Sequence, residues 1–139
     1  MESVCFKDRY ILRLDKGEEV VETLKNFCEK NNIKLANINA IGATNKVKVG
    51  LFNVDKKEYI SKVFEGNFEI TSLIGTVSTM KEETYLHLHT NFSDENCNLY
   101  GGHLNMCYIS ATCEMVIEKI EGKIDREFSA EIGLNLFKF

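Results

Sequence analysis

The sequence predicts an α+β fold in a single domain over residues 1–139, with one main N-terminal helix packed on a mainly antiparallel or mixed β-sheet. Apolar residues recur at helical spacing in one early segment, whereas many later segments alternate apolar and polar residues with the period of a strand. The 139 residues, of which 44% are hydrophobic, are enough to bury one core.

The N-terminal part of the chain predicts one strand and the helix. Residues 6–14 alternate sufficiently to form a strand, which Lys16 and Gly17 end. The helix is predicted from Glu18 to about Asn31, with acidic residues at its favourable N-terminal end. Its core-facing stripe consists of Val20, Val21, Leu24, Phe27 and Cys28.

The remaining elements are predicted to be strands joined by short turns. The predicted strands cover 33–43, 46–54, 58–64 and 68–80, with turns at 55–57 and 65–67, and further strands begin at His103, cover 111–120 and end the chain at 134–139. Gly75 interrupts one strand and indicates a bulge or a close approach of backbones. Residues 125–131 form a polar stretch that contains Arg126.

All three histidines of the chain lie within 17 residues, at His87, His89 and His103. In a strand, alternation with leucine places the first two on one face. A polar loop over 91–98 and two glycines would then return His103 beside them. Three neutral imidazoles with an open fourth position are the ligands of a catalytic zinc site, although nickel, copper and iron also accept imidazole. A single histidine on a strand is more commonly solvated or hydrogen-bonded than bound to a metal. The prediction of a metal therefore depends on three histidines converging.

Other polar residues are candidates to support this site. Histidine ligands need acceptors for their second ring N–H, and Glu69, Asp94, Glu95 and Glu114 offer carboxylates. Arg13 and Arg126 have the side chain that binds a carboxylate or phosphate through two hydrogen bonds. Simple ion pairing or solvation is the alternative for each of these charged residues.

Charge and composition narrow the partners and the compartment. The net charge of −4 and the pI of about 5.4 disfavour DNA binding, which usually needs a basic surface. The five cysteines include no CxxC pair, which is typical of a reducing cytoplasm. No apolar run is long enough to span a membrane and no secretion signal is evident, so we expect a cytoplasmic protein without a membrane partner.

Several linked motifs resemble those of the PPC (plant and prokaryote conserved) domain family. They are GNFEI at 66–70, SLIGT at 72–76, HLH at 87–89 and GGHL at 101–104, with further likeness around Arg13, at AIGA (40–43), and around Arg126 near the end. The resemblance covers nearly the whole chain. It implies a PPC-like fold and a homotrimer, and it aligns Glu69 with the acidic motif of the family. Plant members carry a basic hook for the DNA minor groove, and this chain has no Arg-Gly-Arg-Pro-like segment.

Three functions remain open at this level. The chain is a metal-binding protein, with zinc the expected ion, that binds a small ligand or acts in regulation. Alternatively, it is DNA-binding or transcription-associated, as the family is usually described, or it is a metal-dependent enzyme acting on a small substrate. Salt-dependent retention on DNA would favour the second function, and metal-dependent turnover lost in His87→Ala would favour the third. The sequence identifies no substrate and no ligand.

Overall fold

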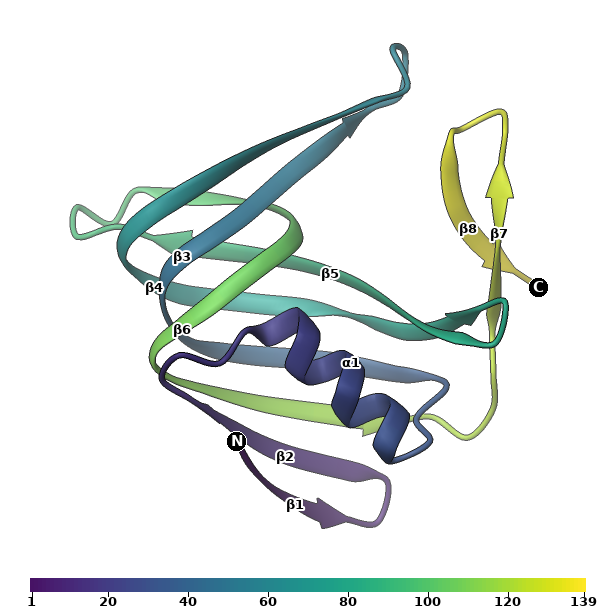
Figure 1. The fold of residues 1–139 in the computed structure, drawn as a ribbon, viewed down its shortest axis with the longest axis horizontal. Coiled ribbons are helices and arrows are strands. Elements are labelled where there is room, and N and C mark those ends of the chain that lie inside the picture. The colour runs from purple at the N-terminus through teal and green to yellow at the C-terminus, as the bar shows by residue number, and fades with distance from the viewer.

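The computed structural model describes residues 1–139, which form one eight-stranded sheet and one helix (Figure 1). The elements in chain order are β1 (Glu2–Phe6), β2 (Arg9–Asp15), α1 (Val20–Lys30), β3 (Ala36–Asn53), β4 (Glu58–Met80), β5 (Glu83–Ser93), β6 (Leu99–Lys119), β7 (Asp125–Ser129) and β8 (Leu134–Lys138). The structure contains no helix with the length and apolar character needed to cross a bilayer.

Four long strands pair in a closed circuit. β3 pairs with both β4 and β6, and β5 pairs with the same two strands from the other side, all antiparallel. The β1–β2 hairpin extends the sheet from β6. The single parallel contact joins Thr79 of β4 to Asp125 of β7, so the sheet is mixed, as the sequence predicts.

The helix packs against β5 and β6 on the inner face of the sheet and covers the core. Its buried residues are Val20, Leu24, Phe27 and Cys28, which confirms most of the predicted stripe. The Glu19 carboxylate caps the first turn by accepting a hydrogen bond from the backbone N–H of Glu22, at 2.7 Å. Its second oxygen accepts one from the N–H of Cys107 in β6, at 2.8 Å, and so fixes the helix to the sheet.

The strands are longer and fewer than the alternation pattern predicts. Two predicted strands, 33–43 and 46–54, are parts of the single strand β3. Likewise, the predicted strands 58–64 and 68–80 are parts of β4. The predicted turn at 65–67 is wrong, because β4 continues through it and the irregularities in its pairing with β3 are register shifts. The strand from His103 and the strand 111–120 are likewise parts of β6.

The structure also contains two strands that the sequence analysis did not assign. The predicted strand 6–14 is divided at Lys7, which has a positive φ of 57° and turns the chain between β1 and β2. The polar stretch with Arg126 forms β7, which pairs with β8 to make a terminal hairpin (residues 125–138). In Figure 1 this hairpin stands apart from α1 at the C-terminal end of the molecule.

Candidate metal centre

The three histidines converge on one face of the sheet. His87 and His89 lie two residues apart on β5, and His103 on β6 is the direct register partner of His89. The Nε2 atoms of His87 and His89 are 3.3 Å apart, and one ring nitrogen from each of the three lies within 4.8 Å of the others. Ligands at the zinc–nitrogen distance of 2.0–2.1 Å in a tetrahedron are about 3.3 Å apart. The three imidazoles therefore fit one transition metal ion after small side-chain rotations.

Glycines allow the backbones at this face to come close together. A Cβ on Gly102 would lie 2.7 Å from the carbonyl oxygen of Gly50, and one on Gly101 would lie 2.6 Å from that of Thr90. Any larger residue would therefore separate β6 from its neighbours beside His103. The backbones of β4 and β5 approach closely at Gly75, one of the two possibilities predicted. A Cβ added at Gly75 would lie 2.1 Å from the carbonyl oxygen of His87.

Two of the histidines are held in the neutral form that binds metal. Partial burial, with smaller contributions from His103, Arg126 and His89, lowers the pKa of His87 from 6.5 to about 4. Burial, followed by the nearby His89, also lowers the pKa of His103. A neutral imidazole has a free lone pair, so these two side chains are ready to bind a metal ion at neutral pH without first losing a proton.

The histidine face forms one wall of a pocket of about 770 Å³. The second wall is the β3–β4 arm (residues 47–64), the long paired extension of β3 and β4 in Figure 1, and the third is the terminal hairpin. Lys57 Nζ donates to the carbonyl oxygen of Ala130, at 2.6 Å, and joins the second wall to the third. The lining includes Tyr85, His87, His89 and His103 on the first wall, Leu51, Phe52 and Tyr59 on the second, and Arg126, Leu136 and Phe137 on the third.

Arg126 is the arginine that the fold brings to this pocket. It is 8% exposed, and its guanidinium lies between the rings of Tyr85 and Phe137, at 4.7 Å and 4.2 Å from their centroids. Its Nε donates to Ser78 Oγ at 2.8 Å, and its Nη1 donates to the carbonyl oxygen of Asn135 at 2.9 Å. Burial lowers the pKa of Arg126 from its usual value, but a guanidinium remains charged in proteins.

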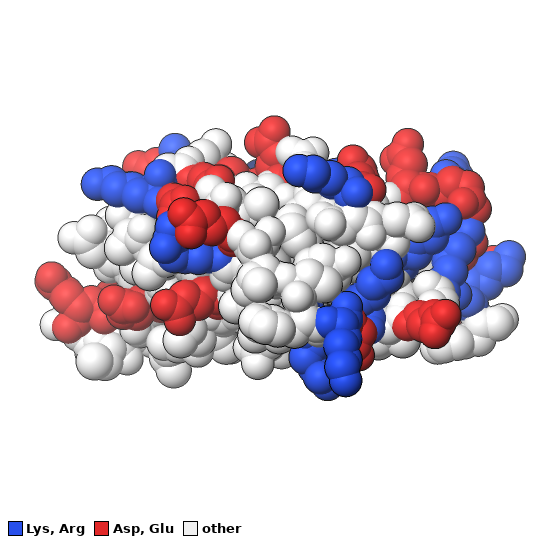
Figure 2. All heavy atoms as spheres, turned by 90° about the horizontal axis from the view of Figure 1, so that it is seen from below, with Lys and Arg blue, Asp and Glu red and all other residues white.

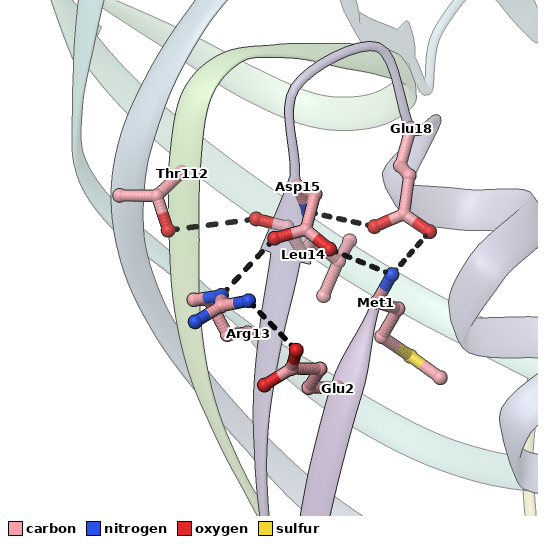
Figure 3. A network of polar contacts seen from close by, with 7 residues as sticks. All are labelled: Met1, Glu2, Arg13, Leu14, Asp15, Glu18 and Thr112. Atoms are coloured by element: carbon pink, nitrogen blue, oxygen red, sulfur yellow. Dashed lines mark hydrogen bonds and ion pairs between the residues drawn. The ribbon is translucent and has the colours of Figure 1, made fainter.

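Arg13 does not line the pocket. Figure 3 shows its guanidinium between two carboxylates, with Glu2 at 3.2 Å and Asp15 at 3.0 Å. Asp15 also contacts the amino group of Met1, which in turn contacts Glu18. Arg13 is thus part of an exposed ion-pair network on β1 and β2, where its charge is already compensated.

Glu69 is also placed outside the pocket. It lies opposite Ser93 at the end of β5, four residues beyond His89. Its side chain is exposed and lines a separate depression with Ile41 and Glu114. Asp94, another carboxylate considered from the sequence, holds its own loop by accepting hydrogen bonds from Asn98 and Tyr100.

The pocket includes residues that the sequence analysis did not select. Tyr85 precedes His87 by two residues on the same strand face, so the alternation that identified the histidines could also have indicated it. Tyr59 had no such signal, because it comes from a distant strand. Its ring lies 5.9 Å from that of His103, and its hydroxyl donates to Asn105 Oδ1 at 2.9 Å.

Three solved structures are similar to this chain over nearly its whole length. A candidate DNA-binding protein from Bacteroides thetaiotaomicron has a TM-score of 0.97 at 31% identity, covering 99% of this chain and 96% of its own. A metal-containing protein from Archaeoglobus fulgidus has a TM-score of 0.89 at 32% identity, covering 99% and 97%. A plant- and prokaryote-conserved (PPC) protein from Pyrococcus horikoshii has a TM-score of 0.86 at 35% identity, covering 94% and 91%.

No curated protein matches the chain. Residues 1–121 match the model of the Plants and Prokaryotes Conserved (PCC) domain, so the match includes all three histidines and ends before the terminal hairpin. The chain therefore belongs to the Plants and Prokaryotes Conserved domain family.

Proposed function

We propose that this chain is a metal-binding protein that holds one zinc ion through His87, His89 and His103. The observation that carries the proposal is the convergence of three ring nitrogens from two paired strands at separations suited to one ion. Three histidines with an open fourth position are a ligand set typical of zinc, and the 3.3 Å between the Nε2 atoms of His87 and His89 is compatible with a tetrahedral ion. The metal-containing relative from Archaeoglobus fulgidus supports a metal in this fold.

We propose that its role is small-ligand or regulatory binding. Three protein ligands leave the fourth position of a tetrahedral ion open, and the pocket lies on that side. Hydrolysis by metal-activated water would benefit from a general base, and no Asp or Glu lines the pocket. This lining supports ligand binding over catalysis.

Metal analysis of the purified protein tests the proposal. We expect one zinc ion per chain by elemental mass spectrometry of the protein as purified, without chelator and after gel filtration. The double variant His87→Ala/His89→Ala should retain none. Asn96→Ala, an exposed change in the loop before β6, should bind as the parent does. Binding that survives loss of both histidines would refute the site, and preferential retention of another metal would refute zinc.

We further propose that the protein is a homotrimer. Val4, Ile11 and Val116 are register partners across β1, β2 and β6, so their side chains form an apolar row on the outer face. They are 48%, 39% and 40% exposed, which favours a protein partner over water. Light scattering on the eluting protein should give three times the chain mass, and Ile11→Glu should lower it. A monomeric parent would refute the assembly.

DNA binding is a second candidate because one similar structure is named as a candidate DNA-binding protein. The net charge of −4 opposes it. On the face drawn in Figure 2, several basic side chains form a band to the right of an uncharged centre, and acidic side chains lie on both sides of it. Fluorescence anisotropy with a labelled duplex at 50 and 200 mM salt decides the question, since a phosphate-binding surface must lose affinity steeply with salt.

A further inference from the structure

The pocket beside the metal centre contains a buried positive charge that no protein carboxylate compensates. The chain has three arginines, and the two exposed ones pair with acids, Arg9 with Glu118 and Arg13 with Asp15. Arg126 is buried and makes no ion pair. A buried charge without a partner is costly, so its presence in a pocket indicates a ligand of opposite charge.

The guanidinium has hydrogen-bonding capacity left for that ligand. Two of its five N–H donors are used, by Ser78 and Asn135, which leaves three. Nη2 makes no hydrogen bond to the protein, and no fully buried polar side-chain atom lacks a partner. Nη2 is therefore reachable from the pocket, while the other contacts and the two aromatic rings hold the group in place.

The positive charge lies next to the metal face. Arg126 stacks on Tyr85, which is two residues from His87 on the same side of β5. The Cα atoms of Tyr85 and His87 are therefore roughly 7 Å apart. The two positive charges of the ion and the one of Arg126 sum to +3 in a pocket lined by no acidic residue. An anion is the chemical group that this combination selects.

The rest of the lining favours an organic anion over an inorganic one. The lining of the pocket includes an apolar surface contributed by Leu51, Phe52 and Leu136. Sulfate or phosphate would leave that surface in contact with water, whereas an alkyl or aryl group would cover it. The volume of about 770 Å³ has room for such a group.

We propose that the pocket binds a small organic carboxylate, with its carboxylate between the metal and Arg126 and its apolar part against the β3–β4 arm and the terminal hairpin. This inference rests on the metal site proposed above. It adds a ligand class and assigns the recognition to a residue that lies outside the span matched by the family model.

Calorimetric titration of the zinc-loaded protein with acetate, butyrate, hexanoate, hexanol and inorganic phosphate tests the inference. We expect hexanoate to bind most tightly, with a gain of roughly fourfold per buried methylene from acetate onwards. Hexanol, which has the chain without the charge, should bind at least about tenfold more weakly than hexanoate. Equal binding of hexanol, or tighter binding of phosphate, would overturn the proposal without any variant being needed.

Two arginine variants test whether Arg126 supplies the positive charge that binds the carboxylate. Arg126→Gln should weaken hexanoate by about tenfold or more and leave hexanol unchanged. Arg13→Gln, which removes an arginine outside the pocket, should leave both affinities unchanged. Melting curves and zinc content of each variant show that it is folded and loaded, and should Arg126→Gln fail either check, Arg126→Lys replaces it with an expected partial loss.

The outcomes separate this inference from the metal site. If zinc is retained but hexanoate does not bind, or binds equally to Arg126→Gln, the carboxylate proposal is refuted and the metal site stands. If the parent protein retains no zinc, the metal site is refuted and this proposal with it.

Discussion

His89 and His103 face each other directly across β5 and β6, although they are 14 positions apart in the chain. Side chains of register partners project on the same side of a sheet, so the pairing alone brings two of the three imidazoles together. An ion bound to both would also join the two strands whose pairing helps to close the circuit of β3, β4, β5 and β6. Metal binding and fold stability should therefore be coupled.

This coupling predicts the result of His103→Ala. Loss of one of three ligands should weaken zinc by at least about 100-fold, more than loss of a supporting residue usually costs. Zinc should raise the melting temperature of the parent protein and leave that of the variant unchanged at the same concentration. Competition with a fluorescent chelator and scanning fluorimetry measure the two effects. A variant that zinc still stabilises as strongly as the parent would contradict the prediction.

Gly75→Ala should destabilise the fold and disturb the metal centre together. Its added methyl would meet the carbonyl oxygen of His87, so β4 and β5 must move apart at a proposed metal ligand. We expect a loss of about 1–3 kcal/mol in the free energy of unfolding, the usual cost of overpacking, and weaker zinc binding. Ser61→Ala is the matched control, because Ser61 is exposed on the same strand and its hydroxyl makes no hydrogen bond. Urea titration with and without zinc gives both quantities, and equal stability of the two variants would argue against the close approach.

Acid should weaken the metal-free protein before its carboxylates titrate. The pKa of His87 falls from 6.5 to about 4 on folding, so between these values the unfolded chain binds more protons than the folded one. Stability should thus be full above about pH 6.5 and decline as the pH falls towards 4. His103, whose pKa is also lowered, adds to the same trend. Urea midpoints of chelator-treated protein at pH 7, 6 and 5 measure it, and His87→Gln should show a smaller decline. A midpoint that rises with acid over this range would reverse the expected sign.

The cysteines should divide into two reactivity classes. Burial raises the pKa of Cys28 to about 12, of Cys107 to about 11 and of Cys113 to about 12, and all three side chains are fully buried. Cys5 and Cys97 are exposed. Because the thiolate is the reactive form, iodoacetamide at pH 8 should add two groups to the native protein and five in guanidinium. Mass spectrometry counts the adducts, and peptide mapping should place the native ones on Cys5 and Cys97.

Local patterns were sufficient to predict that the three histidines converge. Alternation over residues 85–89 identifies one strand face whatever the strand pairs with, and the two glycines before His103 indicate the tight backbone packing beside it. The strand lengths were not predictable in the same way. Gly66 and Asn67 are typical turn residues, yet β4 continues through them because its backbone is paired with β3 on either side.

The positions of the charged candidate residues could not be predicted from local sequence patterns. Arg13 and Arg126 are equivalent as sequence letters, and what distinguishes them is the set of carboxylates that the fold brings near each one. Glu69 depends on strand position, and the pairing of β4 with β5 places it opposite Ser93, beyond the histidines. Each outcome depends on contacts between segments far apart in the chain, which no short pattern contains.

The pocket is lined by side chains from several separate segments of the chain, one of which is the terminal hairpin. The three imidazoles lie within residues 1–121, and the guanidinium comes from the segment that follows. A chimera that keeps the three histidines and takes the last strands of a relative should therefore retain the proposed metal site while exchanging the arginine that we propose meets the ligand. In the proposed arrangement, ligand choice and metal binding can diverge separately, by changes confined to the segment that follows residue 121.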